Sequence, residues 1–278
     1  IYDAARVLAD LKFLVPLTLL PKTPVWFFIA AFLCVIIYVL FAGVEVLGRV
    51  AGVLLPVLLL FILLETLLLW SSESLYTGYL RPVLGEGFGR VAESVWPMGI
   101  AQTYGESIEF AVFWHMLNKR SMLGKISVFA SLFAGLFIVL FDVLAIMALG
   151  EPLFQELIFP AFTILKLASI ADFLENLDAL GALYFMCTAF IKVSVHLLAA
   201  VLCVTELTTS TNRVWAIGIC SAFAFVIALT MAESFAAHLQ AGVEILPRYI
   251  WIPMFVVLPA GALALSLFRG KGRRKLAS

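Results

Sequence analysis

Residues 25–41 read VWFFIAAFLCVIIYVLF, and they decide the class of fold because none of these side chains is charged. A helix that crosses a bilayer needs about 20 mostly apolar residues, and several runs in this chain approach or reach that length. Of all 278 residues, 64% are hydrophobic and 13% are charged. Soluble domains carry about 25% charged residues. We therefore expect an all-α polytopic membrane protein, since the short alternating segments of a β-barrel are not found.

The apolar runs predict eight spans in a single transmembrane domain, residues 1–278. The spans cover residues 1–20, 25–41, 49–70, 94–117, 123–149, 174–206, 213–232 and 248–268. Two polar stretches, 71–93 and 150–172, are expected as loops on the extracytoplasmic side. The second stretch is amphipathic and contains proline, which favours a surface or re-entrant helix.

Basic residues in short loops predict the orientation, because such residues are retained on the cytoplasmic side. One side of the predicted topology carries Arg49, Lys119, Arg120, Lys125, Arg213 and the basic tail 269–275. The C-terminus is therefore expected in the cytoplasm. The formal net charge is zero, so bulk electrostatics give no reason to expect a nucleic-acid partner.

Residues 98–110, MGIAQTYGESIEF, place two glycines and two carboxylates inside a predicted span, with Gly105 near its middle. Gly105 either lets another backbone approach closely or lets the helix unwind, as in transporters that bind small zwitterions at mid-membrane. Glu106 and Glu109 are three residues apart and share a helix face. This polar run favours a binding or coupling site over tight packing alone.

A second polar stripe lies in the span 174–206, where Tyr184, Thr188, Lys192 and His196 recur every four residues and line one face. Lys192 is expected either to form a structural ion pair or to act as an internal cation in place of a bound metal ion. His196 is expected in the packed core. Glu65 and Asp142 are isolated, and hydrogen bonds between helices are their expected role.

Motifs of metalloproteases, serine hydrolases, P-loop proteins and paired cysteines are not found, so the protein is predicted not to be an enzyme. No cofactor and no metal site are predicted.

Four stretches resemble the B subunits (GerAB-type) of bacterial spore germinant receptors, which belong to the amino acid–polyamine–organocation superfamily. They are LPKTPVW (20–26), YLRPVLGEGFGRVAESVWP (79–97), YGESIEFAVFWHMLNK (104–119), and FPAFTILKLASIADFLENLDAL (159–180) with FIKVSV just after it. The resemblance implies a LeuT-like inverted-repeat bundle of ten helices. The eight spans would be the third to tenth of these, with the first two lying before residue 1.

The resemblance also implies positions for a ligand site. The broken sixth helix of such a fold falls on residues 101–109, the third helix would supply Tyr2 and Arg6, and the eighth would supply Thr188 and Lys192 with Tyr184 beside them. The expected ligand-binding residues are Gln102, Thr103, Tyr104, Gly105, Glu106, Tyr184, Thr188 and Tyr2, and the expected coupling groups are Lys192 and Glu109.

The function this implies is a nutrient-sensing subunit in the spore inner membrane that binds an amino acid at mid-membrane. Its partners would be an A-type subunit and a lipoprotein C-type subunit. The alternative is a secondary amino acid transporter of the same superfamily. A third hypothesis is a structural or ion-conducting subunit that binds no ligand.

Overall fold

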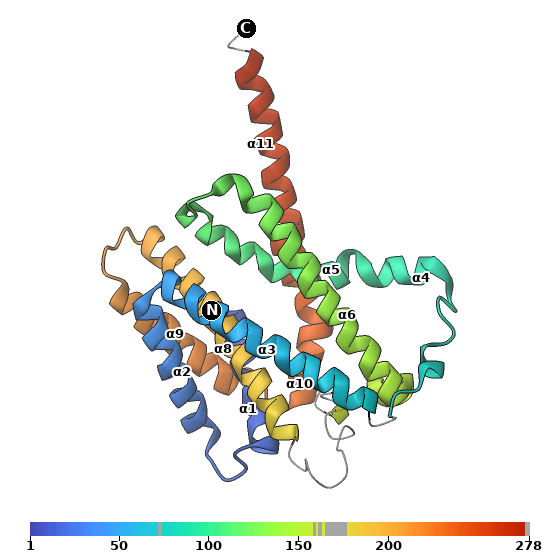
Figure 1. The fold of residues 1–278 in the computed structure, drawn as a ribbon. Helices are drawn as coiled ribbons and strands as arrows, with labels where there is room; N and C mark the ends of the chain where they lie inside the picture. The colour runs from blue at the N-terminus through green and yellow to red at the C-terminus, as the bar shows by residue number, and fades with distance from the viewer. Residues whose placement is uncertain (72–73, 158–159, 161–162, 165–176, 276–278) are drawn as a thin grey trace. The chain divides into compact units, whose positions relative to one another are not determined.

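The computed structural model describes residues 1–278 except 72–73, 158–159, 161–162, 165–176 and 276–278, and at 177–180 and 269–275 it describes the backbone alone. Its described elements are all helical (Figure 1). The predicted surface helix at 150–172 and the start of the span 174–206 lie partly outside the described residues. So do the side chains of the basic tail.

Within the described part of the chain, six helical stretches are long and apolar enough to cross a membrane. They are Val25–Ala42, Val44–Ser71, Arg120–Glu156, Gly181–Leu207, Arg213–Thr230 and Pro247–Phe268. Because every backbone polar group in lipid must be satisfied internally, such runs form helices. The prediction of an all-α polytopic membrane protein is confirmed.

The other two predicted spans take different forms. Residues 1–20 contain α1 (Tyr2–Thr18), a 17-residue helix that carries four charged side chains: Asp3, Arg6, Asp10 and Lys12. Residues 94–117 contain a series of short helical segments with different windings. The total of eight crossings therefore stays a prediction.

The chain divides into two compact units, and the first comprises Ile1–Val83 and Met116–Ala232. Its described helices are α1, α2 (Val25–Ala42), α3 (Val44–Ser71), α6 (Leu123–Glu156), α8 (Leu177–Leu207) and α9 (Arg213–Thr230), with the short η1 (Thr77–Leu80) and η4 (Arg120–Met122). Helix α1 packs against α8 and α9, and α2 packs against both as well (Figure 1).

Small side chains allow these helices to approach closely. Ala216, Cys220, Ala224 and Ala228 recur every four residues on α9, and all four are buried. Helices in membranes associate through close van der Waals packing, so a small-residue face is the expected contact surface. Leu197 of α8 is fully buried in the same unit.

Helix α6 is interrupted at Gly150, where φ is +72° and ψ is 159°, a conformation that favours glycine. The predicted end of this span at residue 149 therefore coincides with the kink. The η1 turn packs on α6, and the Tyr76 backbone N–H donates to the Met147 carbonyl at 2.9 Å. The nearby side chains of Leu69, Leu144 and Leu149 form a buried cluster that joins α3 to α6.

The second unit comprises Leu84–His115 and Glu233–Ser278. Its first part contains α4 (Gly87–Ser94), the π-helical η2 (Val95–Gly99), α5 (Ile100–Tyr104) and the 3₁₀-helical η3 (Gly105–Met116). Its second part contains α10 (Phe235–Gln240), the π-helical η5 (Ala241–Ile245) and η6 (Pro247–Val257), and α11 (Leu258–Lys275). Segments η2 and α5 pack against η6, which joins the two parts.

Candidate functional site

The segment 95–116 changes its helical winding twice. A π-helical turn at Val95–Gly99 is followed by α5, and 3₁₀ winding begins at Gly105. Gly105 keeps right-handed helical torsions, with φ −56° and ψ −45°. The predicted break at 101–109 is therefore a change of winding at Gly105, and the backbone there stays helical.

The non-helical backbone of this segment lies at Trp96, where φ is −116° and ψ is 131°. A residue that precedes proline is restricted toward extended torsions, and Trp96 precedes Pro97. Pro97 signals this break in the sequence, although the predicted break was placed at Gly105.

Gly105 packs closely against Phe255 of η6. A Cβ atom at position 105 would lie 2.5 Å from Phe255 Cδ2 and 3.0 Å from both Cβ and Cγ of that residue. Carbon atoms in contact are normally about 3.5–4.0 Å apart, so only glycine fits this arrangement. The structure therefore shows the close approach of a side chain at Gly105, where the sequence suggested the approach of another backbone or an unwound helix.

The polar side chains around Gly105 are partly accessible. Gln102 and Thr103 are exposed, whereas Tyr104, Glu106 and Glu109 are half-buried. The Gln102 amide donates to the Val243 carbonyl of η5 at 3.5 Å. Residues three apart eclipse one another in a 3₁₀ helix, so Glu106 and Glu109 lie on one side of η3.

The second set of predicted residues lies in the first unit. Tyr184 and Thr188 are half-buried on α8, Lys192 is exposed, and His196 is buried as expected. The Thr188 hydroxyl donates to the Phe185 carbonyl at 2.9 Å, within its own helix. Tyr2 lies exposed in the first turn of α1, which packs on α8.

The predicted ligand-binding residues thus fall in both units. Residues 102–106 belong to the second unit, whereas Tyr2, Tyr184 and Thr188 belong to the first. That they face a common ligand stays a prediction, as does the pairing of Lys192 with an intramembrane acid.

Lys12 has a role that was not predicted from the sequence. Its Nζ donates to the backbone carbonyls of Ala232 at 2.9 Å and Leu229 at 3.4 Å, at the C-terminal end of α9. The end of a helix carries unpaired carbonyls and partial negative charge, so a lysine there is stabilising. A lysine inside an apolar segment was the available signal.

The contacts of Glu65 differ from those expected. Its Oε1 atom is buried and has no hydrogen-bond partner among the described residues, although a hydrogen bond between helices was expected. Its carboxyl group lies close enough to Tyr184 of α8 to interact electrostatically with it. The Tyr184 ring also packs beside Phe141 of α6, with ring centroids 6.1 Å apart. Tyr184 of α8 therefore lies near Glu65 of α3 on one side and contacts Phe141 of α6 on the other.

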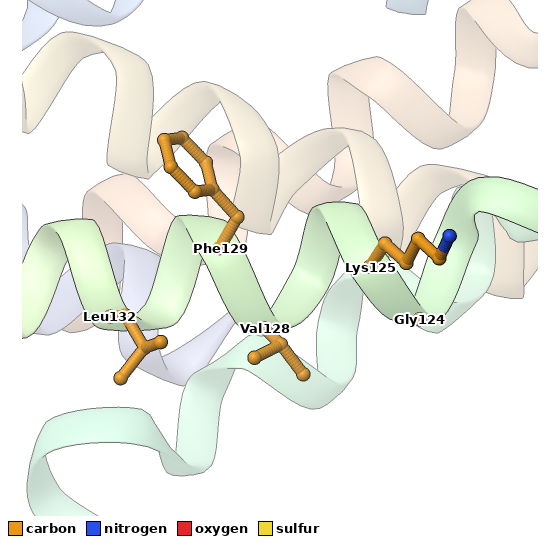
Figure 2. Close-up of a pocket in the computed structure, with 5 residues that line it drawn as sticks. All are labelled: Gly124, Lys125, Val128, Phe129 and Leu132. Carbon is orange, nitrogen blue, oxygen red and sulfur yellow. The ribbon is translucent and has the colours of Figure 1, made fainter.

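A surface depression on α6 contains none of the predicted site residues. Figure 2 shows that its lining comes from one helix: Gly124, Lys125, Val128, Phe129 and Leu132. Most of this lining is apolar and exposed, as expected for a surface that faces lipid. We assign no ligand to it.

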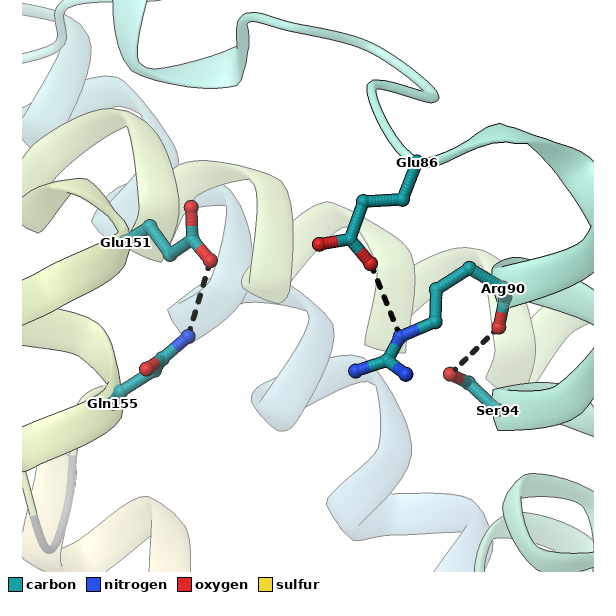
Figure 3. Close-up of polar contacts among 5 residues, drawn as sticks. All are labelled: Glu86, Arg90, Ser94, Glu151 and Gln155. Atoms are coloured by element: carbon teal, nitrogen blue, oxygen red, sulfur yellow. Dashed lines mark hydrogen bonds and ion pairs between the residues drawn. The ribbon is translucent and has the colours of Figure 1, made fainter.

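Exposed polar contacts elsewhere are local. Figure 3 shows Arg90 with Glu86 at 3.1 Å and Gln155 with Glu151 at 3.1 Å, each joining residues four apart in the chain. Pairs at this spacing support the helix that carries them. Across the part of the chain that the structure describes, no three His, Cys, Asp or Glu side chains are grouped so as to hold a metal ion.

Long apolar helices with ionisable groups among them define a polytopic α-helical membrane protein. The chain belongs to the family described as "Spore germination protein", whose pattern matches residues 1–236. It is 27% identical over 274 residues to spore germination protein KB of Bacillus subtilis (strain 168). That alignment covers 99% of this chain and 74% of the relative. No solved structure matches the chain.

Proposed function

We propose that the protein is the B-type membrane subunit of a spore germinant receptor and that it binds a small nutrient, an amino acid, at mid-membrane. Family membership over residues 1–236 is the observation that carries this proposal. The similarity to spore germination protein KB extends over 99% of the chain and supports it.

The candidate ligand contacts are the predicted ones: Tyr2, Gln102, Thr103, Tyr104, Gly105, Glu106, Tyr184 and Thr188. Two features support them. The segment breaks at Trp96 and changes winding at Gly105 beside exposed polar side chains, and transporters use broken helices to bind small zwitterions. Tyr184 and Thr188 are one turn apart on a helix that packs in the first unit.

The proposal includes a two-state mechanism. A ligand shifts an equilibrium only if its affinity for the two states differs, so the nutrient must bind one arrangement of the helices more tightly. Lys192 and Glu109 are the proposed coupling groups. A-type and lipoprotein C-type subunits in the spore inner membrane would convert the shift into germination, with the C-terminus of this subunit in the cytoplasm. The LeuT-like inverted repeat belongs to the same proposal.

Germination of spores tests the proposal directly. A strain that lacks the gene is complemented with the wild-type gene or with Gly105→Leu, Thr188→Val or Lys192→Met, and its spores are exposed to the common L-amino acids. Loss of the Thr188 contact should raise the half-maximal nutrient concentration by roughly tenfold or more. Gly105→Leu should impair the response by disturbing the packing against Phe255, and Lys192→Met by removing the proposed coupling charge. Gly261→Leu, Thr230→Val and Lys22→Met are matched controls at exposed or open positions.

Each result of this experiment bears on a different claim. If the deletion strain germinates normally with every nutrient, the proposed function is wrong. If the deletion strain fails but all three site variants respond like wild type, the function stands and the proposed contacts are wrong.

A further inference from the structure

Glu65 lies in the C-terminal half of α3, where this helix packs against α8. Its neighbours Leu63 and Leu64 are exposed, as expected for side chains that face lipid, whereas Glu65 itself is half-buried. The Oε1 atom is fully enclosed and has no hydrogen-bond partner among the residues that the structure describes. The packing around α3 therefore leaves this carboxyl oxygen without a hydrogen bond from the described residues.

Such an atom requires an explanation, because nearly all buried polar atoms in proteins find a partner and an unpaired one is destabilising. In a membrane the requirement is stricter, and ionisable groups inside spans usually mark a ligand or ion pathway. The missing partner of Glu65 is therefore best sought among ligands that donate hydrogen bonds and carry positive charge.

The side chains beside Glu65 indicate which class of ligand fits there. Tyr184 lies within electrostatic range, and its ring packs against Phe141 at a centroid distance of 6.1 Å and an interplanar angle of 52°. A carboxylate near an aromatic pair is a typical environment for an organic ammonium group, which is attracted by the ring faces as well as by the negative charge. Hard metal cations need several oxygen ligands, and no group of three acidic or other metal-binding side chains forms among the described residues.

We propose that Glu65 binds the ammonium group of an amino acid nutrient, with the rings of Tyr184 and Phe141 beside it. The inference rests on the proposed function and deepens it by naming the group that recognises the ammonium. Three helices of one unit, α3, α6 and α8, supply these side chains. Thr188 lies one turn beyond Tyr184 on α8, in reach of the rest of the same small ligand.

Binding is measured with membranes from cells that produce the full-length natural protein. Each common L-amino acid is used in labelled form, and the best binder is then competed with its own carboxylic acid in which hydrogen replaces the ammonium group. Wild type should prefer the amino acid over this analogue by roughly tenfold to hundredfold, the factor expected for a charge-assisted hydrogen bond.

Glu65→Gln preserves the shape of the side chain and removes its charge. It should lower the affinity for the amino acid by roughly tenfold to hundredfold and leave the affinity for the analogue nearly unchanged. Phe141→Leu should lower the affinity for the amino acid by roughly twofold to thirtyfold through loss of the cation–π contact. Glu45→Gln is the matched control, because Glu45 is an exposed acid on the same helix that pairs with Arg49.

Western blotting of the same membranes shows that every variant is present in equal amount, and circular dichroism of the purified variants shows an unchanged helix content. If Glu65→Gln binds the amino acid with wild-type affinity and discrimination, the role of Glu65 is overturned while the proposed function stands. If wild type binds no amino acid at all, the proposed function is overturned together with this inference.

Discussion

Replacing Gly105 by alanine adds one methyl group at the tight contact between η3 and η6 in the second unit. The new Cβ would lie 2.5 Å from Phe255 Cδ2 and 3.0 Å from the Cβ and Cγ atoms of that residue. Rotation of the ring relieves the first contact but leaves the contact with Phe255 Cβ, which is fixed to the backbone of η6. The backbone of η3 or η6 must therefore move by several tenths of an ångström.

Two opposing effects determine how much Gly105→Ala changes the free energy of unfolding. Overpacking costs about 1–3 kcal/mol, whereas alanine in place of glycine stabilises a helical backbone by up to about 1 kcal/mol. The torsions of Gly105 are helical, so the second effect applies in full. We expect a net loss of up to about 2 kcal/mol in the free energy of unfolding, which lowers Tm by up to about 8 °C.

The assay is thermal unfolding of the full-length natural protein in lipid nanodiscs, followed by tryptophan fluorescence. Gly261→Ala is the control, because Gly261 is helical and nothing lies within 4 Å of its added Cβ. That variant should keep or raise Tm. In a Phe255→Ala background only the contact with Cβ remains, so Gly105→Ala should cost less than it does in the wild-type background. If Gly105→Ala raises Tm as much as Gly261→Ala does, the close approach of η3 and η6 is refuted.

Three other substitutions test local features with the same assay. Lys12→Met removes two hydrogen bonds from a charged donor to the end of α9 and should lower the free energy of unfolding by about 1–3 kcal/mol, while Lys22→Met at an exposed position should change it by less than about 0.5 kcal/mol. Asn212→Ala removes the side-chain cap of α9 and should cost about 0.5–2 kcal/mol, most of which Asn212→Ser should restore. Ser221→Ala removes a buried hydroxyl that has no hydrogen-bond partner among the described residues, so it should be neutral or stabilising, and a loss above about 1 kcal/mol would contradict its unpaired state.

The long apolar runs were predictable from the sequence because hydropathy alone requires them to be helical. Residues 25–41 lie in α2 (Val25–Ala42), and residues 123–149 lie in α6, which is interrupted at Gly150. Both follow from local chemistry: absence of charge in the first case and a glycine that permits positive φ in the second.

The winding of 94–117 was predictable only in part. The sequence singled out Gly105, where the winding changes, but could not name the ring that packs on it, because Phe255 is 150 positions further along the chain. The extended residue at Trp96 follows from Pro97 by a local rule and could have been predicted. The extended torsions at Trp96 therefore have a local cause, whereas the tight contact at Gly105 depends on a residue far along the chain.

In the candidate site, too, some features follow from local spacing and others depend on contacts between distant parts of the chain. The four-residue spacing of Tyr184 and Thr188 places them on one helix face, since spacing alone determines it. The contacts of Glu65 and Lys12 join separate helices, and Lys12 meets a carbonyl 220 positions away. The spacing of residues within one helix does not identify their partners on another helix. The charges themselves were visible, and their presence in apolar segments was the signal that something must pair with them.

The most direct test of the central claim is the time course of a labelled amino acid in proteoliposomes that contain only the full-length natural protein. A receptor subunit should show saturable binding that reaches a plateau near one ligand per protein and is competed by unlabelled nutrient. Continuous accumulation that scales with the internal volume of the vesicles would identify a transporter and contradict the receptor. The absence of any specific binding would contradict the claim that this subunit senses the nutrient.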